Sequence, residues 1–256
     1  MSNSVHRHAV VAGNDHAEAA IRRDLAACYR LIAHCGWDDL IATHISSAIP
    51  GEDAFLINPF GMLFEEITAS SLVKINSAGE LLQPSRFGVN KAGFVVHSAV
   101  HMARPDAGCV IHLHTRDGVA VSMLEGGLLP YNQTAMIYAH DIAFHEYEGV
   151  ADDLAERERL GADLGDKNMM LLRNHGTLAL GRTVGEAFMR IYYLEWCCSV
   201  QIRALSTGQA LHKPDQQVVA AMEKRMKPEM VGDFSDGLLW PAMLRKLDRI
   251  DPSYKE

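Results

Sequence analysis

The chain has 256 residues, of which 48% are hydrophobic and 22% are charged, and its formal net charge at pH 7 is −8. A chain of this size and composition can bury a core of its own, and its scattered Lys and Arg residues exclude the basic patch of a nucleic-acid-binding protein. No window approaches the ~18 consecutive apolar residues of a membrane span, and no apolar leader begins the chain, so we expect a cytoplasmic protein without a membrane or nucleic-acid partner.

The first half of the chain predicts short strands among helices. Residues 1–14 are expected to form a flexible N-terminal arm. From Asp15 to His34 apolar residues recur at helical spacing, with Asp15 as the predicted N-cap. After this helix we expect two short strands around a turn, a hairpin, a helix, a buried strand and a short helix, at residues 43–49, 54–61, 72–82, 89–103, 108–114 and 117–124.

The second half continues the alternation. We expect a helix with an acidic start at 151–165, two buried strands in NMMLLRNHG and LALG, and helices at 183–206 and at roughly 214–227. The tail is expected to be a short helix followed by an extended end. Short strands that alternate with helices predict one α/β domain over residues 15–256, with its core at roughly 17–210 and a C-terminal extension at 211–256.

Two histidines one residue apart stand at the end of the buried strand in DAGCVIHLHTRDG. Side chains in a strand alternate between its faces, so His112 and His114 point the same way. Their neighbours Ile111 and Leu113 face the opposite layer. Two imidazoles on one face near a strand end can bind one metal ion, and a mononuclear catalytic zinc site typically has three protein ligands.

The third ligand has one main candidate and one competing arrangement. His175 follows the apolar strand in LLRNHG, and Gly176 beside it allows a sharp turn or a close backbone approach. The competing pair is His97 and His101, which lie four residues apart on one face of the predicted helix and could hold a metal by themselves.

The segments RPDAGCVIHLHT and LLRNHGTLALG together resemble the class II aldolase/adducin family. That family contains sugar-phosphate aldolases, ribulose-phosphate 4-epimerase, related dehydratases and decarboxylases, and the adducin head. The resemblance covers roughly residues 17–210 and implies that His112, His114 and His175 are the metal ligands. It also implies a three-layer α/β/α sandwich and a homotetramer with active sites at the subunit interfaces.

The sequence departs from the sugar-phosphate aldolases at functional positions. Their Ser-Ser-Glu run falls on residues 91–93, so the Glu that serves as a ligand and general base is Gly93 here. Their phosphate loop corresponds to THIS, with His44 at an Asn position, and Phe60 stands where they use a hydroxyl. The version GVNKAGFVVHSAVH resembles the adducin-type branch of the family.

These departures predict a divalent-metal-dependent carbon–carbon lyase that acts on a small hydroxy- or keto-acid. The metal would stabilise an enediolate or enolate, and decarboxylation would need no base at carbon. We expect one divalent ion per chain, zinc first and manganese, iron or cobalt as alternatives, because imidazole suits several metals. A Glu introduced at Gly93 should tighten metal binding but obstruct the substrate.

Five residues are candidates for substrate binding. Lys91 and Arg116 could hold a carboxylate, for which Arg offers bidentate contact. Asn58 and Gly61 are retained from the family pattern in LINPFG, and His97 lies on the helix that precedes the metal strand.

Three residues are candidate proton donors. His145 and Tyr147 follow the metal strand, and Tyr254 in the tail loosely resembles an aldolase Tyr that reaches a neighbouring subunit's site. Glu195, on a mostly apolar helix, is expected to be structural or at an interface. The alternatives are a sugar-phosphate aldolase or epimerase with a relocated base, and a non-catalytic adducin-like binding module.

Overall fold

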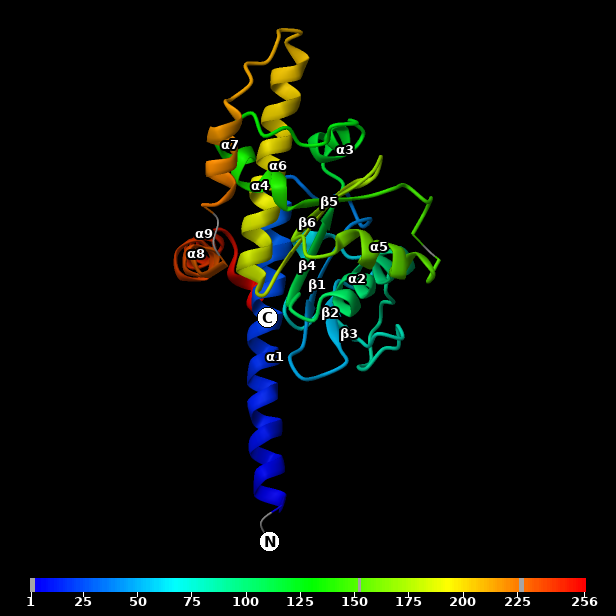
Figure 1. Ribbon diagram of the computed structural model, residues 1–256. Helices are drawn as coiled ribbons and strands as arrows, with labels where there is room; N and C mark the ends of the chain where they lie inside the picture. Colours follow the sequence, from blue (N-terminus) through cyan, green and yellow to red (C-terminus); the bar gives the residue numbers. More distant parts are fainter. Residues whose placement is uncertain (1–2, 152, 226–227) are drawn as a thin grey trace.

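The computed structural model describes residues 3–151, 153–225 and 228–256 of the chain. One seven-stranded mixed sheet, in the order β3-β2-β1-β4-β7-β6-β5, is flanked by helices, so the described residues form a single α/β domain, as predicted (Figure 1). The elements in chain order are α1 (Asn3–His34), β1 (His44–Ala48), β2 (Phe55–Ile57), the 3-10 turn η1 (Phe64–Glu66), β3 (Val73–Ile75), α2 (Lys91–Ala103), β4 (Cys109–Leu113), α3 (Arg116–Ser122), α4 (Gln133–Tyr138), the 3-10 turn η2 (Ala139–Asp141), β5 (Ile142–His145), α5 (Glu156–Leu164), β6 (Met169–Leu172), β7 (Gly176–Gly181), α6 (Val184–Ser206), α7 (Gln216–Glu223), α8 (Pro228–Phe234), the π-helical turn η3 (Ser235–Leu239), α9 (Trp240–Ile250) and the 3-10 turn η4 (Pro252–Lys255).

Strand β4, which carries His112, lies at the centre of the sheet between β1 and β7. Neighbouring strands pair antiparallel, apart from β5 and β6, which run parallel. In this register His44 of β1 stands directly opposite His112. Because β4 is hydrogen-bonded along both edges, it is a rigid mount for the side chains that it carries.

The two faces of the sheet pack against different helices (Figure 1). One core contains Ile111 and Leu113 of β4 together with buried side chains of α1 and α6. The other contains Val110 of β4 together with buried side chains of α2 and α5. Alternation along β4 therefore sends Ile111 and Leu113 to one layer and His112 to the other, and the result is the predicted three-layer α/β/α sandwich.

Several elements differ from the prediction. Helix α1 begins at Asn3, so Asp15 lies inside the helix instead of capping it; no proline interrupts residues 3–34. The sequence analysis missed α4, α8 and the strand β5, because these elements are only four to seven residues long and carry no clear periodicity. The end of the tail is the 3-10 turn η4 and not an extended segment, and Asp251 caps this turn by accepting from the amide of Ser253.

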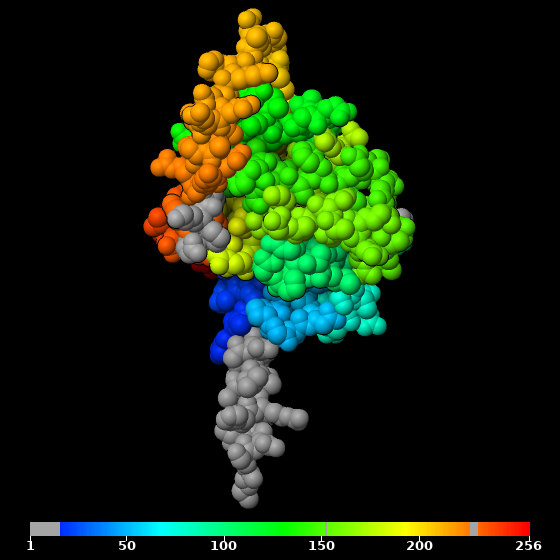
Figure 2. Space-filling model, viewed as in Figure 1, coloured from blue at the N-terminus to red at the C-terminus, as the bar shows by residue number. Residues whose placement is uncertain are grey.

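The C-terminal segment folds back onto the domain. Helix α7 packs against α4, as the orange atoms beside the green ones show in Figure 2, and α9 packs against α1. None of the helices in the described ranges is long and apolar enough to cross a membrane.

Candidate metal centre

The end of β4 presents the first two histidines of the site. His112 is the penultimate residue of β4, and His114 follows the strand's last residue, so both side chains lie on the α2 side of the sheet. Only 2% of His112 is exposed. Thr115 then caps α3 by accepting a hydrogen bond from the amide of Gly118, which ends the strand direction directly after His114. The predicted alternation along this segment is confirmed.

The connection between β6 and β7 presents the third histidine. The amide of His175 donates to the carbonyl of Leu172 at 3.0 Å, which closes a tight turn. Asn174 adopts a φ of 56°, a left-handed conformation that Asn tolerates better than most residues. A Cβ atom at Gly176 would collide with the carbonyl oxygen of Leu113 and lie 3.1 Å from the ring of His114. The sequence Asn-His-Gly thus supplies the turn, the ligand and the close approach of β7 to β4.

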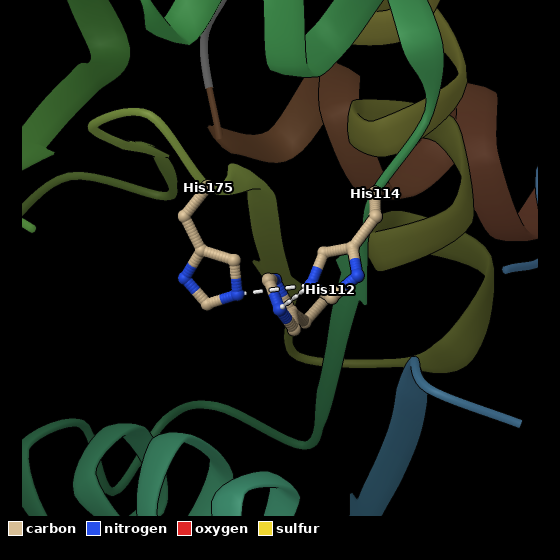
Figure 3. A group of neighbouring side chains, drawn as sticks. All are labelled: His112, His114 and His175. Atoms are coloured by element: carbon tan, nitrogen blue, oxygen red, sulfur yellow. Dashed lines mark hydrogen bonds between the residues drawn. The ribbon is translucent and has the colours of Figure 1, made fainter. Parts of the chain in front are cut away.

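The three imidazoles converge on one point (Figure 3). The Nε2 atom of His114 lies 2.9 Å from Nε2 of His112 and 2.9 Å from Nε2 of His175. Two nitrogens that share a zinc ion at about 2.1 Å each can be no more than ~4.2 Å apart, so these separations fit a common ion. The structure therefore brings His112, His114 and His175 together, hereafter the convergent histidines, and their role as metal ligands is taken up below as a proposal.

Hydrogen bonds at the far side of two rings fix which nitrogen carries the proton. Nδ1 of His112 lies 3.0 Å from the carbonyl oxygen of Thr177, which can only accept, and Nδ1 of His114 lies 3.1 Å from a carboxylate oxygen of Asp39. Both Nδ1 atoms are therefore donors, and both Nε2 atoms present lone pairs to each other. Lone pairs at 2.9 Å repel unless a cation lies between them, so the donor set fits a metal ion.

Burial keeps two of the three rings, His112 and His175, neutral. Burial, and then the neighbouring His175 and His114, hold the pKa of His112 well below its usual range. Burial and then His114 and His145 lower the pKa of His175 to about 4. Neutral imidazole is the form that ligates metal, so neither ring must lose a proton for binding at neutral pH.

The competing pair forms a second group with different bonding. The hydroxyl oxygen of Ser46 lies 2.6 Å from Nδ1 of His97 and 2.8 Å from Nε2 of His101, and Nδ1 of His101 lies 3.1 Å from the carbonyl oxygen of Ala107. His97 and His101 are thus bridged by Ser46 and are hereafter the bridged histidines. This arrangement contradicts the alternative in which the pair alone holds a metal.

A cavity of about 200 Å³ opens beside the convergent histidines. Tyr147 lies at its mouth, 54% exposed, with its ring centroid 6.4 Å from that of His175. The walls are mostly apolar, which favours a small ligand with a short carbon chain. The residues that line it are Ala42, His44, Ala92, Val96, His112, His114, Tyr147, Gly149, Val150, Ala151 and His175.

His44 is the polar side chain of this cavity to which the sequence analysis gave no role. It is 3% exposed, and within the described residues neither of its ring nitrogens has a hydrogen-bond partner. Burial, followed by the effect of His114 and His175, lowers its pKa to about 3. The sequence did contain a signal for His44. Two positions differ from the sugar-phosphate aldolases together, His44 in the phosphate-loop motif and Gly93 in the Ser-Ser-Glu run.

Asp39 and Thr177 were also missed, although both orient ligand histidines. Asp39 lies 75 positions before His114, and Thr177 meets His112 through its backbone carbonyl, which no side-chain motif can reveal.

Two predicted substrate-binding residues serve other structures. Asn58 is buried, and its side-chain oxygen accepts a hydrogen bond from the hydroxyl of Tyr29 at 2.9 Å. Gly61 has a φ of 107° and lies in an exposed turn, so a conformational reason explains its identity. His97 is fully buried behind His44 and does not line the cavity, which corrects its expected contact with substrate.

The two predicted cations lie near the site. Lys91 is the first residue of α2, and its neighbour Ala92 lines the cavity. Arg116 begins α3 and lines an adjoining cavity of about 630 Å³ that also contacts His114 and Asp39.

Two of the three predicted proton donors are engaged elsewhere. Nδ1 of His145 lies 2.7 Å from Asp163, and Nε2 lies 3.4 Å from Glu156, so both ring nitrogens tie β5 to α5. The hydroxyl of Tyr254 donates to Asp248 at 2.9 Å, and its ring is buried in the core of its own chain. The geometry favours structural roles for both and leaves Tyr147 at the cavity.

The sequence profile of the Class II Aldolase and Adducin N-terminal domain matches residues 23–202. A Caulobacter vibrioides protein that bears a provisional aldolase class 2 name is 50% identical over 94% of this chain and 93% of its own length. Mouse alpha-adducin is 44% identical over 76% of this chain, a match that spans 27% of adducin.

Solved structures agree with this match. An aldolase II superfamily protein from Pseudomonas syringae superposes with a TM-score of 0.87 at 46% identity, over 94% of this chain and 96% of that one. An L-fuculose 1-phosphate aldolase from Glaciozyma antarctica superposes with a TM-score of 0.80 at 28% identity, over 93% of both chains.

Proposed function

The chain belongs to the class II aldolase and adducin family, and from this membership we propose that it is a divalent-metal-dependent carbon–carbon lyase acting on a small hydroxy- or keto-acid. The observation that carries the proposal is the convergence of three imidazoles, one buried and two half-buried, through their Nε2 atoms. A chain without a metal-dependent role has no evident reason to hold facing lone pairs at 2.9 Å in a cavity.

The chain's residues divide the work of holding the ion. His112, His114 and His175 would be its ligands, while Asp39 and the carbonyl of Thr177 orient two of the rings. A divalent ion bound there supplies Lewis acidity toward oxygen atoms of the substrate. Zinc suits the three-histidine set best, and manganese, iron and cobalt are alternatives.

A substrate with a carboxylate fits the surroundings of the site. Helix α2 begins beside the cavity at Lys91 and Ala92, and the N-terminal end of a helix favours negative charge. Gly93 offers no carboxylate that could act as a base at carbon, which favours decarboxylation over proton abstraction. Arg116, in the adjoining cavity, is a further cation near the site.

Tyr147 is the residue best placed to deliver a proton. Its side chain lines the cavity, is open to solvent and lies across from His175. A phenol in this position can protonate the carbon that loses the carboxyl group and be reprotonated from water.

The mouth of the cavity supports a homotetramer with shared active sites. Val150 lines the cavity but is 74% exposed, and Leu40, next to Asp39, is 71% exposed. Large apolar side chains beside a catalytic cavity are typical of surface that a second copy covers. Light scattering at micromolar concentration should therefore give the mass of four chains, and a Val150→Glu variant should shift it toward smaller species.

Two alternatives have specific support. The similarity to alpha-adducin favours a non-catalytic binding module, and the similarity to an L-fuculose 1-phosphate aldolase favours a sugar-phosphate aldolase or epimerase with a relocated base. A module of the first kind would not require metal. An enzyme of the second kind would require it and would turn over phosphorylated sugars.

Metal analysis and a substrate panel separate the three functions. Protein stripped with a chelator is reconstituted with zinc, manganese, iron or cobalt, and the metal content per chain is measured by mass spectrometry. Turnover is then followed on hydroxy acids, keto acids and sugar phosphates, with His114→Ala as the control. The panel includes 3-keto acids, because loss of CO₂ from these leaves an enolate. We expect near one equivalent of metal and product from an acid. Cleavage of sugar phosphates alone would support the aldolase, and absence of both metal and turnover would support the binding module.

A further inference from the structure

His44 lies in the same row of side chains as the metal ligands. It stands opposite His112 in the pairing of β1 with β4, so both side chains leave the same face of the sheet. The two rings are nearly parallel, at 21°, with centroids 6.3 Å apart. His44 also lines the cavity that contains the convergent histidines. Its ring is therefore part of the wall that a bound substrate would meet.

The ring of His44 is buried with its hydrogen-bonding capacity unused. Among the described residues, neither Nδ1 nor Nε2 has a partner, and the residue is 3% exposed. A buried polar group that lacks a partner destabilises a protein, so such groups are rare and usually meet a ligand or serve function.

Gly93 is what makes room for this ring. A Cβ atom at position 93 would lie 2.6 Å from Cγ and Cδ2 of His44 and 2.7 Å from its Nε2. Any side chain at Gly93 must therefore displace the imidazole. A Glu introduced at this position, which we expect to tighten metal binding and to obstruct the substrate, would first have to displace His44.

His44 is not a fourth ligand in this arrangement. Among the described residues, the ligand atoms that lie within 4.8 Å of one another come from His112, His114 and His175 alone. Two nitrogens on a common ion would be at most about 4.2 Å apart. The imidazole of His44 therefore faces the space beside the ion rather than the ion itself.

Taken together with the proposed function, on which this step rests, these observations lead us to propose that His44 binds the substrate. Its neutral imidazole hydrogen-bonds an oxygen of a hydroxy- or keto-acid held at the convergent histidines. A neutral ring can donate one hydrogen bond and accept another, which matches a hydroxyl or carboxylate oxygen. In this proposal substrate specificity depends on His44, a side chain of the sheet. Gly93 of α2 leaves the space for its ring at the position where the sugar-phosphate aldolases carry a Glu.

The test uses the full chain loaded with cobalt, whose visible spectrum reports its coordination, and glycolate as the probe. Glycolate is the smallest 2-hydroxy acid, and its dissociation constant is measured from the spectral change. His44→Phe removes the hydrogen bond but keeps a ring, and His44→Gln keeps a donor and an acceptor. His97→Phe is the matched control, because His97 is a buried neighbour whose Nδ1 is bonded to Ser46.

We expect His44→Phe to keep one equivalent of cobalt and to weaken glycolate binding by about tenfold or more. His44→Gln should recover most of that affinity. Without metal, His44→Phe should melt at a higher temperature than the wild type, because an unpartnered polar ring is removed, whereas His97→Phe should melt lower and bind glycolate normally.

Several results would overturn the inference alone. They are unchanged glycolate affinity in His44→Phe, loss of cobalt in that variant, or a fall in its melting temperature to the level of His97→Phe. If the larger ring of Phe prevents the His44→Phe protein from folding, the glycolate affinities of His44→Gln and Gly93→Ala test the inference instead. Gly93→Ala should weaken glycolate binding by displacing the ring, and normal binding in Gly93→Ala would count against us. Wild-type protein that binds no cobalt would overturn the proposed function first, and this inference with it.

Discussion

The convergent histidines and the bridged histidines are two imidazole groups on the same side of one sheet, and they differ in which partners their ring nitrogens have. Burial lowers the pKa of His101 to about 4, just as it contributes most to the pKa of about 4 at His175, so charge does not separate the groups. In the bridged group Ser46 occupies the facing nitrogens of both rings. In the convergent group the facing nitrogens meet only one another.

This difference shows that the partners of the facing nitrogens, and not residue type, separate a structural histidine from a candidate ligand, since Nε2 of His97, which faces away from Ser46, has no hydrogen-bond partner within the described residues. A chain of donors runs from His97 through Ser46 and His101 to the carbonyl of Ala107, and every step pairs a donor with an acceptor. The convergent group has no such chain of donors and acceptors. Nδ1 of His112 donates to Thr177 and Nδ1 of His114 donates to Asp39, so neither ring has a proton left for the contact between their Nε2 atoms. His44 lies between the groups, with centroids 5.8 Å from His97 and 6.3 Å from His112, and belongs to neither.

The largest effect is expected from replacing a convergent histidine. His114→Ala should abolish metal binding and lyase activity, because its Nε2 is the atom that both other Nε2 atoms approach. Metal content by mass spectrometry is the measurement. His101→Gln is the matched control and should keep its metal. A His114→Ala protein that retains one equivalent would remove the distinction between the groups.

The next effect concerns a partner of the convergent group. Asp39→Ala removes the carboxylate that fixes the tautomer and orientation of His114. Loss of such an outer hydrogen bond typically weakens metal affinity by about 10–100-fold. Competition with a chromophoric chelator measures the change, and Asp38→Ala, one residue earlier, is the control. Equal affinities in the two variants would show that Asp39 does not orient the ligand.

A third variant should affect stability and spare the metal. Ser46→Ala leaves Nδ1 of His97 and Nε2 of His101 without their shared partner. We expect the free energy of unfolding to fall by about 2 kcal/mol while metal affinity stays unchanged. Urea denaturation of metal-free protein gives the first value, and chelator competition gives the second. Weaker metal binding in Ser46→Ala would mean that the two groups are coupled.

The smallest expected effect is a pH dependence of the free energy of unfolding, caused by Glu195, whose hydrogen-bond partners Thr115 and Thr177 neighbour the convergent histidines. Glu195 accepts hydrogen bonds from the hydroxyls of Thr115 and Thr177. Burial raises the pKa of this carboxyl to about 7, against the lowering effect of those two bonds. At a pH between the ordinary pKa of a Glu and 7, Glu195 is protonated in the folded chain and ionised in the unfolded chain. The contribution of Glu195 to the free energy of unfolding therefore falls as the pH rises through that range.

Glu195→Gln does not titrate, so its stability relative to the wild type should increase from pH 5 to pH 7.5. Urea midpoints of metal-free protein at the two pH values provide the measurement. Gln keeps an oxygen that can accept from one of the two Thr hydroxyls. A constant difference between the variant and the wild type would show that Glu195 does not titrate in this range.

Local patterns predicted much of the fold. The strand that ends in His112 and His114 and the long helix after position 183 follow from periodicity within a few residues, whereas the turn at Asn174 falls inside a segment that was predicted as strand. The missed elements are the short ones. Strand β5 pairs in parallel with β6 across the crossover helix α5, and nothing in its four residues specifies that partner.

Two predicted site residues have hydrogen-bond partners away from the cavity, and the reason is physical. Asn58 and Tyr254 match family positions by sequence, yet each side chain is bound by a residue that the fold brings to it, Tyr29 and Asp248 respectively. A motif states which side chain is present, whereas its hydrogen-bond partner depends on how the elements pack, whether they are 29 positions apart, as for Tyr29 and Asn58, or six, as for Asp248 and Tyr254.

The sequence by itself determined that His112 and His114 share one face and that Gly93 carries no carboxylate, because strand alternation and side-chain identity are local properties. The tertiary structure alone decided that the Nε2 atoms converge, that Asp39 reaches His114 across 75 positions, and that the ring of His44 occupies the space above Gly93. These contacts join α2, β1, β4 and the β6–β7 turn, and they exist only once both faces of the sheet are packed.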